Sequence, residues 1–152
     1  MTEDLWGIEL NRAIARARNW TIRRREWETE QEARLYRNQS LWEFYDEDGD
    51  FVGIVLAENE EVAWVEAWRH DGNNLTALPD WAYDIGIALE ECERIVDIMN
   101  YRFELYYAEA GWMSGFYNLD LEEGEYIESR GSYDAEAVAR LLLAYYLKEK
   151  ED

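Results

Sequence analysis

Three consecutive arginines form the sharpest cluster of chemically useful side chains in the sequence, and tryptophans flank them. Guanidinium groups beside aromatic rings can grip phosphate groups or stack on nucleobases. On a strand, Arg23 and Arg25 share one face while Arg24 takes the other. The alternative is that these arginines neutralise acidic residues of the same chain. An anion or nucleotide site built on this run would consist of Arg23, Arg25, Trp20 and Trp27.

A second cluster consists of carboxylates on a helix predicted to follow Pro79 and Asp80. Glu90, Glu93 and Asp97 recur at three- and four-residue spacing, which places them on one face of that helix. Such a face either binds a basic protein surface or is simply solvated. A carboxylate metal site would have the same spacing, but the single histidine of the chain makes a metal site a poor interpretation.

The segment that begins at Asp46 resembles the start of a calcium-binding EF-hand loop, with acidic residues also at Asp48 and Asp50. The glycine that this loop requires would fall at Phe51, and its closing glutamate at Ala57. Because both positions fail, we interpret the segment as an acidic hairpin turn.

Neither His70 nor Cys92 belongs to a recognisable catalytic motif. His70 follows a predicted strand and has no nucleophile that sequence logic would pair with it, while Cys92 lies on the buried stripe of a predicted helix. No serine lies in a nucleophile motif, and no glycine-rich phosphate loop is present. We therefore expect no enzyme activity, no cofactor and no metal.

The charge of the chain is unevenly distributed. Residues 1–40 hold eight arginines against seven acidic residues, whereas residues 41–152 hold seven basic residues against twenty-eight acidic ones, a net charge of −21. A field of one sign repels nucleic acid and anionic membranes and attracts basic protein surfaces. We expect a basic protein partner, with no direct nucleic-acid contact and no membrane contact.

Length and apolar content indicate one domain, spanning residues 1–152, with enough apolar material for a core. The longest apolar run, residues 141–147, is far shorter than the roughly 20 residues that cross a bilayer. The start of the chain lacks the features of a signal peptide. The lone cysteine cannot form an internal disulfide. A cytoplasmic location in a bacterial host is the expectation.

Apolar periodicity predicts the order helix, four strands, helix, three strands, helix. Tight turns between consecutive strands indicate antiparallel pairing, and amphipathic helices must cover the sheet. The predicted fold is therefore α+β, a mainly antiparallel sheet covered by three helices in an α-β-α sandwich. Residues 28–40 are predicted to be a loop or a short exposed helix, and residues 62–68 a strand. The predicted core contains Trp20, Phe103, Leu105, Trp112, Ile85, Leu89 and Leu142.

Several segments are similar to the phage α-β-α sandwich family, small proteins encoded mostly by bacterial viruses and prophages. The resemblance lies in the second predicted helix and the segments that follow it, and the end of the first helix with the strand after it also matches. The similar segments are residues 17–22 (ARNWTI), 78–85 (LPDWAYDI), 101–105 (YRFEL), 111–116 (GWMSGF) and 132–142 (SYDAEAVARLL). Ala82 and Tyr83 stand where the family usually has serine and threonine.

The resemblance implies a phage-like origin and an α-β-α sandwich, and it brings no catalytic residues. Together with the charge, it suggests a non-catalytic acidic binding protein. Such a protein could inhibit a host defence protein, or another nucleic-acid-binding protein, through carboxylates that mimic phosphates. The alternatives are a protein that binds or sequesters a nucleotide or another anion at the arginine run, and a toxin-immunity or phage accessory protein. Exposed aromatic residues are compatible with a homodimer.

Overall fold

The computed structural model describes residues 5–69, 78–119 and 126–151. The chain folds into two compact units, whereas the sequence predicts one domain over the same stretch. A discontinuous unit comprises Met1–Ala17 and Pro79–Asp152, and an inserted unit comprises Arg18–Leu78. Each unit has its own sheet and its own helices.

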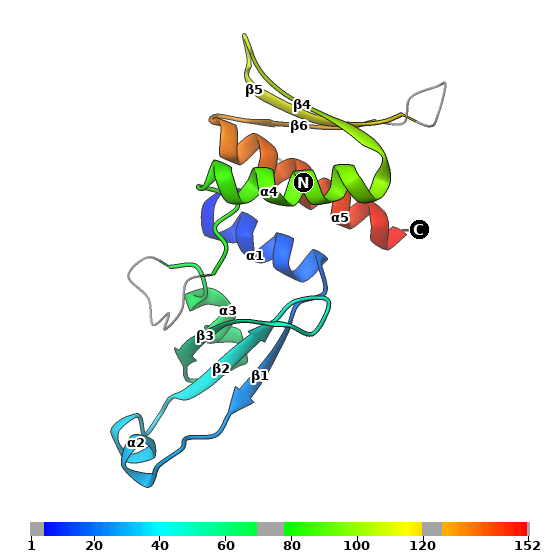
Figure 1. Cartoon of the computed structure of the whole chain (residues 1–152). Coiled ribbons are helices and arrows are strands. Elements are labelled where there is room, and N and C mark those ends of the chain that lie inside the picture. Colours follow the sequence, from blue (N-terminus) through cyan, green and yellow to red (C-terminus); the bar gives the residue numbers. More distant parts are fainter. Residues whose placement is uncertain (1–4, 70–77, 120–125, 152) are drawn as a thin grey trace. The chain divides into compact units, whose positions relative to one another are not determined.

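The inserted unit is an antiparallel sheet of three strands with two short helices (Figure 1). Its strands follow the chain order β1-β2-β3, so each strand pairs with its neighbour in sequence. Its elements are β1 (Thr21–Arg25), α2 (Glu30–Leu35), β2 (Ser40–Tyr45), β3 (Phe51–Ala57) and α3 (Glu60–Glu66). Helix α2 confirms the short exposed helix that was one of two expectations for residues 28–40.

Aromatic rings form the core of the inserted unit. Phe44 is fully buried and meets the ring of Trp64 edge-on, with 4.9 Å between the ring centroids. Trp68 lies 6.1 Å from Trp20 and 6.3 Å from Trp64, centroid to centroid. Such pairs add a specific geometry to the burial of large apolar surfaces. The prediction that Trp20 is a core residue is confirmed, since it is 7% exposed.

The strand predicted over residues 62–68 is wrong, because most of this segment forms α3. Asn59 caps the helix, and its side chain accepts a hydrogen bond from the N–H of Val62. Large apolar residues at even-numbered positions, Val62, Trp64 and Trp68, imitate one face of a strand. The buried residues instead follow helical spacing: Ala63, Trp64, Ala67 and Trp68.

The discontinuous unit is a second antiparallel sheet packed on helices (Figure 1). Its strand order is β4-β5-β6, and α4 and α5 lie against the sheet while α1 lies against α5. Its elements are α1 (Gly7–Ala17), α4 (Ile85–Met99), β4 (Tyr101–Ala108), β5 (Gly111–Asn118), β6 (Tyr126–Gly131) and α5 (Asp134–Glu151).

Helix α5 carries much of the core of this unit. Val138, Leu141 and Leu142 are each 0% exposed. The hydroxyl of Ser114 on β5 donates a hydrogen bond of 2.7 Å to the carbonyl oxygen of Ala137, which ties the sheet directly to the helix backbone. Small residues on α5 allow this close approach, so the sheet is held firmly on the helix.

The α+β class and the antiparallel pairing are confirmed, in the form of two three-stranded sheets and five helices among the described residues. Leu142 is buried as predicted, but the remaining predicted core residues of this unit are only half-buried. One end of the β4–β5 hairpin is poorly covered, since Tyr107 is 70% exposed. The half-buried set is Ile85, Leu89, Phe103, Leu105 and Trp112.

Candidate functional site

A single residue, Asn100, separates helix α4 from strand β4. Asp84 caps the start of α4, where its carboxylate accepts a hydrogen bond from the N–H of Ile87. The helix ends at Asn100, which adopts a left-handed conformation with φ of 54° and donates its N–H to the carbonyl of Val96. Asparagine tolerates this conformation better than most residues. Tyr101 then begins β4, and residues of both the helix and the strand line one groove.

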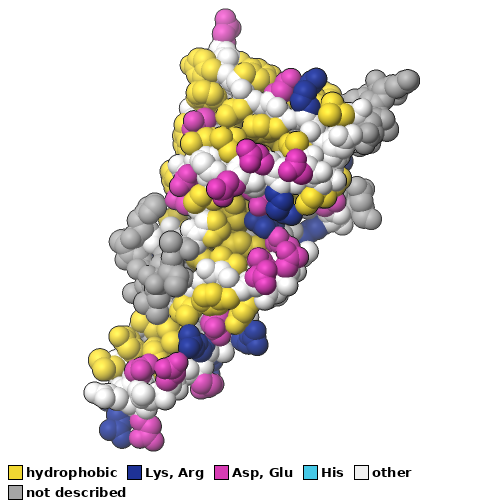
Figure 2. Space-filling view, in the orientation of Figure 1, with side chains coloured by type: hydrophobic (Ala, Val, Ile, Leu, Met, Phe, Trp, Pro, Cys, Tyr) yellow, Lys and Arg dark blue, Asp and Glu magenta, His cyan; other side chains and the backbone are white. Residues whose placement is uncertain are grey.

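The predicted acidic face lies on the exposed surface of α4. Glu90, Glu93 and Asp97 are all exposed, and no described basic side chain forms an ion pair with them. Glu91, by contrast, faces inward and accepts a hydrogen bond from Arg94 at 3.1 Å. Figure 2 shows acidic side chains along α4, with hydrophobic surface between them and the strands. The three carboxylates therefore point toward solvent and are available to a partner.

Between α4 and β4 lies a groove of about 670 Å³. Its wall on the helix side carries Glu93 and Asp97 beside apolar residues, so two of the three predicted acidic residues stand at its edge. Leu119, which follows β5, also lines the groove and is 57% exposed. The remaining lining residues are Leu89, Cys92, Val96, Tyr101, Arg102 and Phe103.

Cys92 lies at the buried side of this groove and is 1% exposed. Burial raises the pKa of its thiol far above the usual range, and the charges of Glu91 and Glu93 raise it further. The thiol therefore stays protonated and is a poor nucleophile. Its predicted place on the buried stripe of the helix is confirmed.

The sequence does not predict the groove. Apolar periodicity predicts a closed core at Leu89 and Phe103, but these residues line an open depression instead. One feature of the sequence points to an open groove: the apolar stripe of this helix is bordered by Glu93 and Asp97. Acidic residues beside an apolar stripe indicate that this side of the helix reaches solvent.

The four residues predicted for an anion site are not brought together. Arg23 lies over the ring of Tyr45, with 4.7 Å from its guanidinium carbon to the ring centroid. Arg25 forms an ion pair of 3.0 Å with Glu28. Trp20 is in the aromatic core, whereas Trp27 stacks on Tyr36 with 5.0 Å between centroids.

Arg24, which the sequence placed on the opposite face, lines a cavity of about 570 Å³ in the inserted unit. Arg37 shares this cavity, and no described carboxylate forms an ion pair with either guanidinium. The sequence pattern does not indicate Arg37, because the turn after α2 is what brings this residue to the cavity. The other lining residues are Trp27, Ala33, Tyr36, Asn38, Gln39, Ser40, Trp42, Glu58 and Asn59.

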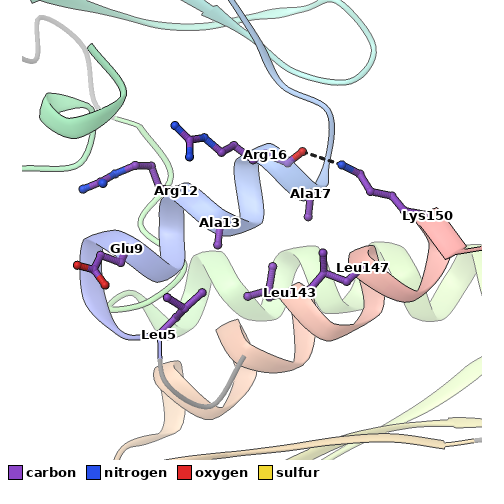
Figure 3. A pocket seen from close by; sticks show the side chains of 9 residues that line it. All are labelled: Leu5, Glu9, Arg12, Ala13, Arg16, Ala17, Leu143, Leu147 and Lys150. Atoms are coloured by element: carbon purple, nitrogen blue, oxygen red, sulfur yellow. Dashed lines mark hydrogen bonds between the residues drawn. The ribbon is translucent and has the colours of Figure 1, made fainter. Parts of the chain in front are cut away.

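A third depression, of about 540 Å³, lies between α1 and α5 (Figure 3). Its floor is apolar, but the guanidinium groups of Arg12 and Arg16 point away from Leu143 and Leu147. The ammonium group of Lys150 donates a hydrogen bond of 3.1 Å to the carbonyl oxygen of Arg16. Burial, together with the charge of Arg16, lowers the pKa of Arg12. The cationic groups therefore do not converge on one ligand position.

The acidic turn brings three carboxylates within 4.8 Å of one another, from Asp46, Asp48 and Asp50. The side chain of Asp46 accepts hydrogen bonds from the N–H groups of both Asp48 and Asp50, at 3.0 and 2.9 Å. These hydrogen bonds belong to the predicted hairpin turn. His70, the other candidate for chemistry, lies outside the described residues.

The chain matches no model of a known protein family, and a comparison with curated proteins finds no relative. The resemblance to the phage α-β-α sandwich family therefore stays a prediction. Among the described helices, none combines the length and the apolar character that a bilayer span requires.

Proposed function

We propose that this chain is a non-catalytic binding protein that docks the acidic face of α4 on a basic surface of another protein. The observation that carries the proposal is the state of Glu90, Glu93 and Asp97, which are exposed and have no ion-pair partner among the described residues. Nearby cations are already engaged: Arg94 with Glu91, and Arg102 with Glu104 at 3.3 Å.

The charge of the discontinuous unit supports the same function. Its sequence holds eight basic residues against twenty-one acidic ones, a net charge of −13. Carboxylates arrayed on a helix can stand in for backbone phosphates, so the partner would be a protein that normally holds nucleic acid. With the phage-like motifs of the sequence, this makes an inhibitor of a host defence protein the proposed biological role.

The test is a charge reversal with a matched control. Glu90, Glu93 and Asp97 are changed together to lysine, and binding of a peptide of alternating lysine and glycine is measured by its association rate. We expect slower association for this variant, with little change in folding stability, because exposed charges contribute little to stability. The control reverses three exposed acidic residues of the inserted unit, Glu26, Asp48 and Asp50. If peptide association slowed equally in both variants, the α4 face would not be the specific docking surface.

A second candidate function, the binding of a nucleotide or another anion, is favoured by the cavity at Arg24 and Arg37. Two guanidinium groups there lack an ion-pair partner among the described residues, and Trp27 and Tyr36 offer stacked rings. Denaturing mass spectrometry of purified protein would detect a co-purified nucleotide. Changing Arg24 and Arg37 to alanine should remove it, whereas Arg34→Ala, an exposed arginine that does not line the cavity, should not.

A further inference from the structure

The groove between α4 and β4 adds a second requirement to the acidic face. We propose that it receives one large apolar side chain from the partner, so that the docking segment is amphipathic as well as basic. This inference rests on the proposed function and specifies its partner. The docking segment would carry a leucine, phenylalanine or tryptophan with lysine or arginine on either side.

The floor of the groove is apolar. Leu89 and Val96 from α4 line the groove together with Phe103 from β4, and each is only half-buried. Leu119 is 57% exposed, although its N–H is held by the carbonyl of Asn100 at 3.3 Å. A pre-formed apolar depression of this kind gains free energy when a side chain displaces its water. Its volume of about 670 Å³ can take a large aromatic or aliphatic side chain.

The rim of the groove on the α4 side is acidic. Glu93 and Asp97 are four residues apart on α4 and stand along the same edge of the groove. The one cation among the described lining residues, Arg102, pairs with Glu104 and lies 5.1 Å from the ring centroid of Tyr117, so its charge is partly satisfied. The rim of the groove therefore presents net negative charge to a partner. This charge favours cations on either side of the partner's apolar side chain.

An apolar centre with a polar rim is the arrangement in which interface energy usually concentrates. The rim excludes an acidic partner, and a second copy of this chain brings its own net charge of −20. A purely cationic partner would leave the apolar floor in contact with water. A basic amphipathic segment is the occupant that satisfies both the floor and the rim.

The experiment compares two peptides of equal length and charge. One alternates lysine with glycine, and the other replaces the central glycines with leucine. Leu119→Ser changes an exposed groove residue and should leave the fold intact. The matched control is Ile98→Ser: Ile98 is 65% exposed on the same helix as Leu89, and it lies about 180° around that helix from it.

We expect the leucine peptide to bind wild type more tightly than the glycine peptide, and Leu119→Ser to weaken it about tenfold, the order expected for one buried aliphatic group. The glycine peptide should be insensitive to Leu119→Ser, and Ile98→Ser should affect neither peptide. As a second measurement, a photo-crosslinking residue at the central leucine should label Leu89, Val96 or Phe103.

The outcomes separate this inference from the proposed function. If both peptides respond to reversal of Glu90, Glu93 and Asp97 but neither responds to Leu119→Ser, the acidic face stands and the groove inference is overturned. If neither peptide responds to the charge reversal, both fall. If Leu119→Ser and Ile98→Ser weakened binding of the leucine peptide equally, the peptide would be contacting apolar surface without preference for the groove. That result would also overturn the inference.

Discussion

Asn11 is a residue whose single side chain joins two distant segments of the discontinuous unit. It is 1% exposed, donates a hydrogen bond of 2.8 Å to the carboxylate of Asp80, and accepts one of 2.9 Å from the N–H of Ala82. These contacts hold the segment before α4 against α1. The placement of the acidic helix therefore depends on a buried side chain whose nitrogen and oxygen are both hydrogen-bonded.

Replacing Asn11 with leucine should lower the free energy of unfolding by about 2–3 kcal/mol, because the N–H of Ala82 loses its partner and the Asp80 carboxylate loses a donor. Denaturant unfolding measures the change. Asn38→Leu, at an exposed position, is the control and should change stability little. If Asn11→Leu unfolded at the same denaturant concentration as wild type, the hydrogen bonds of Asn11 would not be needed to hold the two segments together.

Tyr145 should make the fold sensitive to alkaline pH. Burial raises the pKa of Tyr145 to about 12, and the charge of Glu149 adds to this. Its phenol has a pKa of about 10 in the unfolded chain, so stability is complete below that pH and falls as pH rises toward 12. We expect Tyr145→Phe to lessen this loss by about 1–2 kcal/mol in unfolding experiments between these pH values. Tyr107→Phe, at a 70% exposed position, should keep the wild-type profile.

The sequence predicts that the acidic residues share one face, but it does not predict the surroundings of the arginine run. Helical spacing alone decides that Glu90, Glu93 and Asp97 share a face, and local sequence contains that information. The surroundings of Arg23 depend on Tyr45, which β-pairing brings across from another strand. A sequence read locally cannot supply such long-range partners.

At the scale of elements, the contact between β6 and α5 depends on Gly131. A Cβ atom there would lie 2.9 Å from the Cα of Ala137 and closer still to its backbone nitrogen. Gly131→Ala should therefore push the strand from the helix and lower stability by about 3 kcal/mol, as a thermal melt would show.

The control for this prediction is Gly86→Ala in α4. An added Cβ there meets only the Asp84 side chain, at 3.3 Å, and alanine favours a helix over glycine by up to about 1 kcal/mol. This variant should be neutral or slightly more stable than wild type. If the two alanine variants melted alike, the close packing of strand on helix would not limit stability.

The type of most elements followed from their periodicity, but α3 and the α4–β4 groove did not. In and just after α3, Val62, Trp64 and Trp68 lie at even-numbered positions and so imitate one face of a strand. The cap at Asn59 is what distinguishes a helix from a strand here. The groove could not be predicted because periodicity identifies an apolar face without saying whether another element closes over it. Leu89 and Phe103 have the sequence character of core residues, yet they line a depression.

At the scale of the whole molecule, the net charge of −20 acts on folding and on binding in opposite directions. Repulsion among like charges destabilises the compact state, whereas the same field attracts a basic partner. Salt shortens the Debye length from about 10 Å at 0.1 M to about 3 Å at 1 M. Screening should therefore strengthen the fold and weaken docking in one titration.

We expect sodium chloride over this range to raise the melting temperature by about 3 °C, equivalent to a stabilisation on the order of 1 kcal/mol, while slowing association with the lysine–glycine peptide. Changing Glu90, Glu93 and Asp97 to glutamine brings the net charge to −17 and should reduce both effects. The binding effect should fall more, because the three residues are a large part of the docking face but a small part of the total charge. A loss of salt sensitivity that is equal in melting and in binding would mean that the partner responds to the overall charge and not to α4.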